Sequence, residues 1–173
     1  YTDEGIPWIT PKDLSINKHK FIARGEIDIT ELGLKNSSAK IMPRGTVLFS
    51  SRAPIGYIAI AIGNVTTNQG LKSIVPNSNI GTAYVYFFLR ENLATIESMS
   101  TGSTFKEVSG STMKAIEVII PDDETLDRFN DLCNPIFCKQ ELLESENANL
   151  ANIRDILLPK LMSGEIDVSE VAI

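Results

Sequence analysis

The 173 residues have 43% apolar side chains and a net charge of −6, which suits a globular fold with a real core. No apolar run approaches the roughly 20 residues that span a bilayer, and the first residues lack a signal-peptide pattern, so we expect a cytoplasmic protein with no membrane contact. Residues 1–120 hold twelve Lys or Arg and ten Asp or Glu, whereas residues 121–173 hold four and twelve, so the body can still present a basic face.

Residues 1–121 are expected to form one domain. Short segments rich in Ile, Val, Phe and Thr alternate with Gly, Pro, Asn and Ser, which is typical of β structure. In chain order the sequence predicts a helical turn at 11–14, a turn at 43–45, strands at 46–49 and 56–62, a turn at 63–64, a strand at 71–75, an amphipathic helix at 81–99, a short helix after Thr104 and a strand at 115–120. The fold class is therefore α+β, with a mostly β body and a few short helices.

Residues 122–173 are expected to form a second region, built on one helix from about residue 125 to residue 162 that Gly164 ends. Pro135 should kink or split this helix. A coiled-coil seam for dimerisation is predicted from apolar residues spaced seven apart, namely Ile136, Leu143, Leu150 and Leu157. Polar groups near the seam, at Gln140, Asn147 and Arg154, favour a defined partner and register. Alternatively the seam folds back on its own β body, although a helix of roughly 57 Å would be covered only in part.

The residues that could carry catalysis are few. Cys133 and Cys138 are expected to be reduced packing residues, because two cysteines in a helix make neither a disulfide framework nor a four-ligand zinc site. His19 is interpreted as a solvated loop residue, and no phosphate-binding Gly-rich loop precedes a Lys-Ser or Lys-Thr pair. Residues 134–137 resemble the Asn-Pro-Pro-aromatic motif of amino-methyltransferases, but the third position differs. We therefore predict no catalytic residue, no metal site and no cofactor.

Polar and basic side chains gather in four segments between the apolar ones. Arg and Lys suit guanine edges and phosphates, Asn and Gln can pair with adenine, and hydroxyl groups can hold phosphate oxygens. Each segment alone is also compatible with an ordinary polar turn. The candidate DNA-binding residues are Lys18, Lys20 and Arg24; Ser50, Ser51 and Arg52; Thr67, Asn68, Gln69 and Lys72; and Ser103, Thr104 and Lys106.

Whole phrases of the sequence resemble one protein family, the specificity subunits of type I restriction-modification systems. The chain resembles one target-recognition domain with its conserved helical region, because the family's phrases occur here in order, at residues 5–14, 43–56, 67–72, 101–112 and 156–166. Structural demands account for several of them, since Gly45, Gly56 and Gly70 suit turns while Trp8 and Phe49 are expected to anchor the core.

The resemblance implies a non-catalytic DNA-recognition subunit. The body would read one half-site of double-stranded DNA, and the helix would pack antiparallel on that of a second recognition domain. The helices would also bind the methyltransferase subunits and, through them, the restriction subunits, which hold the enzymatic chemistry. One copy here fits either a fragment of a two-domain subunit or a half-length subunit that self-associates and reads an inverted repeat. The alternative function is a protein-assembly module with no DNA specificity.

Overall fold

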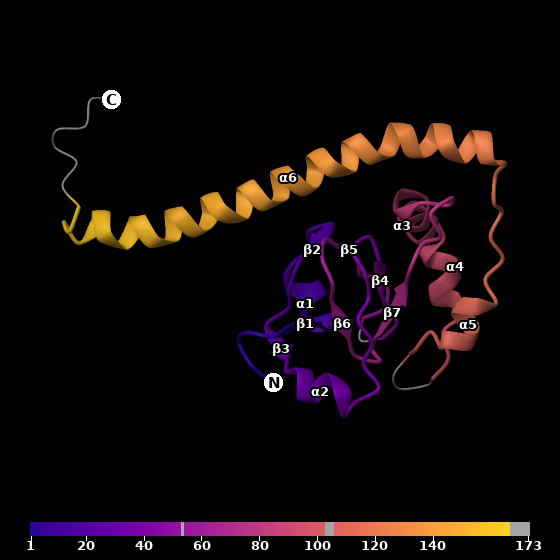
Figure 1. Cartoon of the computed structure of the whole chain (residues 1–173), viewed down its shortest axis with the longest axis horizontal. Coiled ribbons are helices and arrows are strands. Elements are labelled where there is room, and N and C mark those ends of the chain that lie inside the picture. Colours follow the sequence, from indigo (N-terminus) through magenta and orange to yellow (C-terminus); the bar gives the residue numbers. More distant parts are fainter. Residues whose placement is uncertain (53, 103–105, 167–173) are drawn as a thin grey trace. The chain divides into compact units, whose positions relative to one another are not determined.

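A computed structural model describes residues 1–52, 54–102 and 106–166 (Figure 1). It has two compact units, Tyr1–Pro135 and Ile136–Ile173. The described residues form, in chain order, β1 (Ile6–Ile9), α1 (Pro11–Ile16), β2 (Phe21–Ile22), β3 (Ile27–Ile29), α2 (Glu31–Lys35), β4 (Val47–Ser50), β5 (Ile58–Ala61), β6 (Thr66–Thr67), β7 (Leu71–Ile74), α3 (Thr82–Glu91), α4 (Leu93–Ser98), α5 (Gly110–Lys114) and α6 (Asp123–Met162). The predicted α+β class with a long C-terminal helix is confirmed. The domain boundary expected between residues 121 and 122 stays a prediction.

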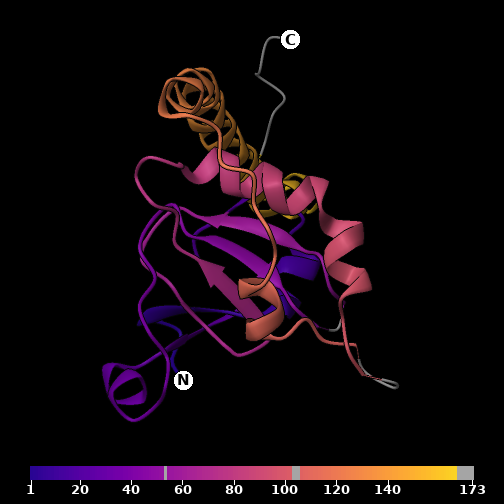
Figure 2. The ribbon, with the colours of Figure 1, turned by 90° about the vertical axis from the view of Figure 1, so that its right-hand side faces the viewer.

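The strands of the described residues form two mixed sheets inside the first unit. In one sheet β1 lies between β3, which is antiparallel to it, and β6, which is parallel to it. The other sheet has the order β2-β5-β4-β7, in which β4 is antiparallel to both neighbours and β2 is parallel to β5. Helix α3 runs across this second sheet and contacts β4 and β5 (Figure 2). The sheet is therefore covered rather than open to solvent on that side.

The core lies on both faces of β4. Leu48 belongs to an apolar cluster with Ile9 of β1 and with Val65, which directly precedes β6, whereas Val47 and Phe49 point to the opposite face because side chains alternate along a strand. All five side chains have no exposed surface. Burial on both faces explains why β4 is a continuous apolar run without polar alternation. The expectation that Phe49 anchors the core is confirmed, but Trp8 is only half-buried.

Three of the four predicted strands are confirmed, as β4, β5 and β7, but the predicted strand at 115–120 is wrong. In this part of the described chain α5 is followed by an irregular segment, and Val118, Ile119 and Ile120 are 42%, 88% and 55% exposed. Residues of high β propensity form a strand only where a neighbouring strand supplies hydrogen bonds. This segment pairs with none of the strands described.

The predicted helices lie close to their expected positions, but their bounds differ. The helix expected at 81–99 is two helices, α3 and α4, because Asn92 between them turns its side-chain amide back to donate to the Phe88 carbonyl, at 2.8 Å. The short helix expected after Thr104 is wrong, since Glu107 forms isolated bridges instead. The helix begins later, as α5, where the Ser109 hydroxyl accepts from the Thr112 amide.

Helix α6 begins two residues before its predicted start, after Asp122, whose carboxylate accepts from the Thr125 amide at 2.8 Å. That hydrogen bond lowers the pKa of Asp122. Its first turns belong to the first unit, where Leu126 is buried and the Phe129 ring lies edge-on to Tyr84 and Phe87 of α3. Pro135 was expected to kink or split the helix. The helix continues through it, so the split is wrong and the kink stays a prediction; three turns on one side and seven on the other outweigh one missing hydrogen bond.

The two cysteines are free and differ in exposure. Cys133 is 8% exposed, and burial raises the pKa of its thiol, an effect that nearby Lys20 only partly opposes. Cys138 is exposed, so the expectation of a packing role is wrong for it. Because thiolates react and thiols do not, we predict that a disulfide reagent at pH 8 modifies Cys138 quickly and Cys133 only after unfolding. Counting the thiols that react with and without denaturant checks this, and fast reaction of both in the folded protein would contradict it.

The second unit continues α6 to Met162, and Gly164, at φ +75°, follows its end as predicted. The four predicted seam residues, Ile136, Leu143, Leu150 and Leu157, are 50%, 42%, 57% and 40% exposed. The described helices include none that is both long and apolar enough to cross a membrane.

Candidate nucleic-acid interface

Three of the four predicted polar segments meet at one end of the second sheet, where β4 ends and β7 begins. Ser50 of β4 pairs with Leu71 of β7, and the Ser51 amide donates to the Gly70 carbonyl at 2.9 Å. The third segment joins through Val108, whose amide donates to the Ser51 carbonyl at 2.9 Å. Backbone hydrogen bonds therefore bring together segments that lie up to about 55 residues apart in the sequence.

The centre of this region is Glu107, which binds two basic residues. The Arg52 guanidinium lies 3.8 Å from one carboxylate oxygen, and the Lys72 ammonium lies 3.4 Å from the other. The backbone of Glu107 also bridges to Arg52 and to Thr101. We call Arg52, Lys72 and Glu107 the Glu107 cluster. Its side chains are 22–40% exposed and its net charge is +1, so it holds two cations in fixed positions without neutralising them.

The remaining residues of these segments differ in how much surface they offer. Gln69 and Lys106 are exposed beside the cluster, and the Gln69 carbonyl accepts from Lys72 at 3.4 Å. The Asn68 side chain accepts from the Gly70 amide at 2.9 Å, and the Thr67 hydroxyl bonds to Ser73. These two side chains are half-buried and shape the turn before β7. Ser103 and Thr104 lie outside the described residues.

Two predicted residues are used inside the fold. Ser50 and Ser51 have no exposed surface. The Ser50 hydroxyl donates to the Pro54 carbonyl at 2.9 Å and accepts from the Tyr57 amide at 2.7 Å, and the Ser51 hydroxyl donates to Gly70. Both hydroxyls form hydrogen bonds with buried backbone groups, so neither can reach DNA. Ser50 and Ser51 are therefore not candidate DNA-binding residues.

The first predicted segment does not stay together. Arg24 pairs at 3.3 Å with Asp28, a residue of β3 that is 1% exposed. The Lys20 ammonium lies over the Tyr86 ring, 5.1 Å from its centroid. Lys18 lies on the exposed side of a pocket that the sequence gave no reason to expect. Lys18, Lys20 and Arg24 thus lie within a span of six positions but in three different environments of the fold.

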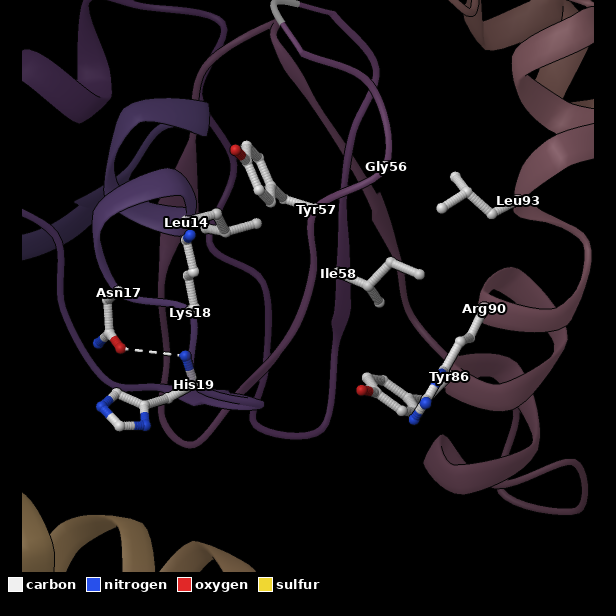
Figure 3. A pocket seen from close by; sticks show the side chains of 10 residues that line it. All are labelled: Leu14, Asn17, Lys18, His19, Gly56, Tyr57, Ile58, Tyr86, Arg90 and Leu93. Carbon is white, nitrogen blue, oxygen red and sulfur yellow. Dashed lines mark hydrogen bonds between the residues drawn. The ribbon is translucent and has the colours of Figure 1, made fainter.

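That pocket has a volume of about 270 Å³ and lies within the first unit. Figure 3 shows Lys18 and His19 on one side of it and Tyr86 and Arg90 of α3 on the other, with Tyr57 and Ile58 between them. His19 does lie in an exposed loop, as predicted, with its amide donating to the Asn17 side chain at 3.2 Å. Sequence reasoning missed Tyr57, Tyr86 and Arg90, because only the packing of α3 on β5 brings them close to Lys18.

Comparison with known proteins identifies the family. The sequence model described as "Type I restriction modification DNA specificity domain" matches residues 1–141. The chain belongs to this family. The resemblance of its ordered phrases to specificity subunits is therefore confirmed.

Relatives of this family are longer than the chain. It is 41% identical over 153 residues to the type I restriction enzyme MjaIX specificity subunit of Methanocaldococcus jannaschii, covering 83% of the chain and 35% of the relative. It is 29% identical over 169 residues to the HindI specificity subunit of Haemophilus influenzae, covering 96% of the chain and 36% of the relative. The chain thus spans about a third of the length of these relatives.

Solved structures share the fold. One chain, from a structural study of complex assembly in a type I R-M system, matches 91% of this chain and 38% of its own length with a TM-score of 0.57 at 18% identity. The HsdS subunit from Thermoanaerobacter tengcongensis matches 94% of this chain and 38% of its own length with a TM-score of 0.54 at 16% identity. The two-sheet body with a long helix is therefore the fold of known type I specificity subunits.

Proposed function

We propose that this chain is the part of a type I restriction-modification specificity subunit that reads one DNA half-site. The observation that carries the proposal is the Glu107 cluster, where three separate polar segments converge and two cations stay partly exposed. Arg52 can bind a guanine edge or a phosphate, and Lys72 suits a phosphate oxygen. Gln69 and Lys106 extend the same exposed surface.

The long helix is proposed to set the distance to the second half-site. Its apolar row faces either the helix of a second copy or that of a second recognition domain, and the paired helices bind the methyltransferase subunits. The restriction subunits join the complex through the methyltransferase subunits. The chain itself needs no cofactor in this scheme, because methyl transfer and DNA cleavage belong to the partner subunits.

Alanine at Arg52 or at Lys72 tests the DNA contact. The half-site is found by mapping methylated bases in the source genome with and without this gene. Each change is expected to weaken binding to that duplex about tenfold at low salt, and to reduce the slope of log K against log salt by about 0.9 where the lost contact is a phosphate. Fluorescence anisotropy at several salt concentrations measures both. The control is Lys35→Ala on α2, an exposed lysine outside the cluster; unchanged affinity in both cluster variants contradicts the assignment.

Glu107→Gln tests the same surface in the opposite direction. The change removes the negative charge that Arg52 and Lys72 share, and it keeps the size of the side chain. Affinity for a duplex without the target sequence is expected to rise, about threefold to tenfold at low salt, because both cations become available to phosphates. A fall in this affinity contradicts a phosphate-facing role for the cluster.

A further inference from the structure

The turn that leads into β7 is held in place from several sides. The Leu71 amide donates to the Asn68 carbonyl at 3.2 Å, and the Asn68 side chain accepts from the Gly70 amide at 2.9 Å. The Gly70 carbonyl accepts from the amide and from the hydroxyl of Ser51, at 2.9 and 3.1 Å. Gly70 also lies against Pro11 of α1, because an added Cβ would come within 2.7 Å of that ring. The backbone of the turn is therefore fixed by its own hydrogen bonds and by its neighbours in the fold.

Gln69 is the second residue of this turn, and its side chain is exposed. The polar side chains beside it are used inside the fold, since Asn68 holds the Gly70 amide and the Thr67 hydroxyl bonds to that of Ser73. Within the part of the chain that the structure describes, the side-chain amide of Gln69 has no hydrogen-bond partner. Its donor and its acceptor are therefore both open to a ligand.

The Glu107 cluster lies directly beside Gln69. The Lys72 ammonium donates to the Gln69 carbonyl at 3.4 Å, and Glu107 joins Lys72 to Arg52. Cations that bind phosphates fix the register of a protein on a duplex but carry no sequence information. A neutral polar side chain held next to them can supply that information, because base edges present donors and acceptors in a pattern that differs from base to base.

The chemistry of a primary amide favours one base. Its oxygen accepts a hydrogen bond and its NH₂ group donates. In the major groove adenine presents an acceptor, N7, beside a donor, the N6 amino group, so that one glutamine forms two hydrogen bonds with it. Guanine presents two acceptors there, cytosine a donor and thymine an acceptor. Each of these three bases leaves one half of the amide unpaired.

We propose that Gln69 specifies an adenine of the half-site, through its edge in the major groove, while the cations of the Glu107 cluster hold the duplex in register. This inference rests on the proposed function and adds the base that one residue selects. Gln69 is then a specificity-determining residue, whose loss changes which sequence is preferred more than it changes the affinity for DNA in general.

Replacement of single base pairs tests this assignment. Fluorescence anisotropy measures the affinity of the full chain for the mapped target duplex and for duplexes in which each base pair is replaced in turn by the other three. The wild-type chain is expected to prefer one A·T pair over its replacements about tenfold or more, and Gln69→Ala is expected to bind all four duplexes of that position about equally. The matched control is Lys106→Ala, which removes another exposed side chain beside the cluster. It should weaken all duplexes alike and keep the preference.

A change of one atom in the DNA tests the contact itself. 7-Deazaadenine pairs with thymine but carries C–H in place of N7, so it offers no acceptor to the Gln69 amide. At the selected position it is expected to weaken binding of the wild-type chain about fivefold, the scale of one hydrogen bond. Binding of Gln69→Ala should not change, because that variant has no contact left to lose. Circular dichroism checks that the variant chains fold.

Several results would overturn the assignment of Gln69. They are a Gln69→Ala chain that keeps every base preference of the wild type, one that loses a preference at a G·C pair, one that binds all duplexes more weakly by the same factor, and an equal effect of 7-deazaadenine on both chains. An affinity that Arg52→Ala lowers, with base preferences that Gln69→Ala retains, leaves the proposed function standing and overturns only this inference. A wild-type chain without preference for the mapped target contradicts the proposed function, and this inference with it.

Discussion

Replacing Asp13 by Ala is expected to destabilise the first unit by about 2–4 kcal/mol, because one buried carboxylate then leaves three donors without a partner. Asp13 is 8% exposed. One of its oxygens accepts from the Thr10 amide at 2.8 Å and from the Thr10 hydroxyl at 2.6 Å, and the other accepts from the Glu26 amide at 2.8 Å. These bonds cap α1 and tie it to the segment before β3. Urea unfolding followed by circular dichroism measures the loss.

The neighbouring residue supplies the control for this prediction. Lys12 lies in the same helix and forms an ion pair with Glu26 in which both side chains are more than 60% exposed. Solvent screens such a pair, so Lys12→Ala is expected to unfold at nearly the wild-type urea concentration. Asp13→Asn should fall between the two variants, since the amide keeps one acceptor oxygen. If Asp13→Ala is no less stable than Lys12→Ala, the carboxylate does not hold these segments together.

The role of Asp13 explains why the family phrases could be recognised from the sequence. The phrase at residues 5–14 contains β1 and the first turn of α1 with this cap, and the Gly5 amide donates to Asp28 at 2.8 Å. A side chain on Gly5 would come within 2.6 Å of the Ile29 carbonyl oxygen. Gly45 and Gly56, in the next phrase, have φ of +85° and +102°, which L residues rarely adopt. Because these phrases determine the fold, they also allow the family to be recognised from the sequence.

The candidate site could be predicted from the sequence only in part. Residue types in the sequence pointed to Arg52 and Lys72, which the structure brings together, but nothing in the sequence marked Glu107 as their common partner. The hydroxyls of Ser50 and Ser51 looked available because burial cannot be read from a polar residue at a strand end. The pocket combines Lys18 with Arg90, 72 positions away, and such a pairing depends on how α3 packs across the sheet.

The long helix was the most predictable element, since a pattern repeated every seven residues needs no tertiary context. Its start and end agree with the structure within two residues. The split expected as one outcome at Pro135 does not occur, because a helix of 40 residues has enough hydrogen bonds on both sides of the proline to continue.

Replacing both Leu143 and Leu150 by Asp is expected to abolish pairing of the helix with a second copy. The intact chain should scatter light at micromolar concentration as a dimer of twice 19.0 kDa. Each leucine is about half exposed, so burying the remaining half contributes about 0.7–1.5 kcal/mol. Four of them in a dimer supply about 3–6 kcal/mol, a large share of the roughly 8 kcal/mol of a micromolar complex. Their loss, together with four buried charges, leaves too little to hold the pair.

The matched control places the same charges on the opposite side of the helix. Ser145→Asp with Asn152→Asp adds two carboxylates seven residues apart, at exposed positions about 200° around the helix from the leucine row. Net charge then changes alike in both variants, whereas helix propensity falls only in the leucine variant, so circular dichroism must show that the helix of both variants stays folded. The control should remain a dimer while the leucine variant becomes a monomer. A wild-type chain that is monomeric at micromolar concentration contradicts self-pairing, and a leucine variant that still dimerises shows that another surface joins the copies.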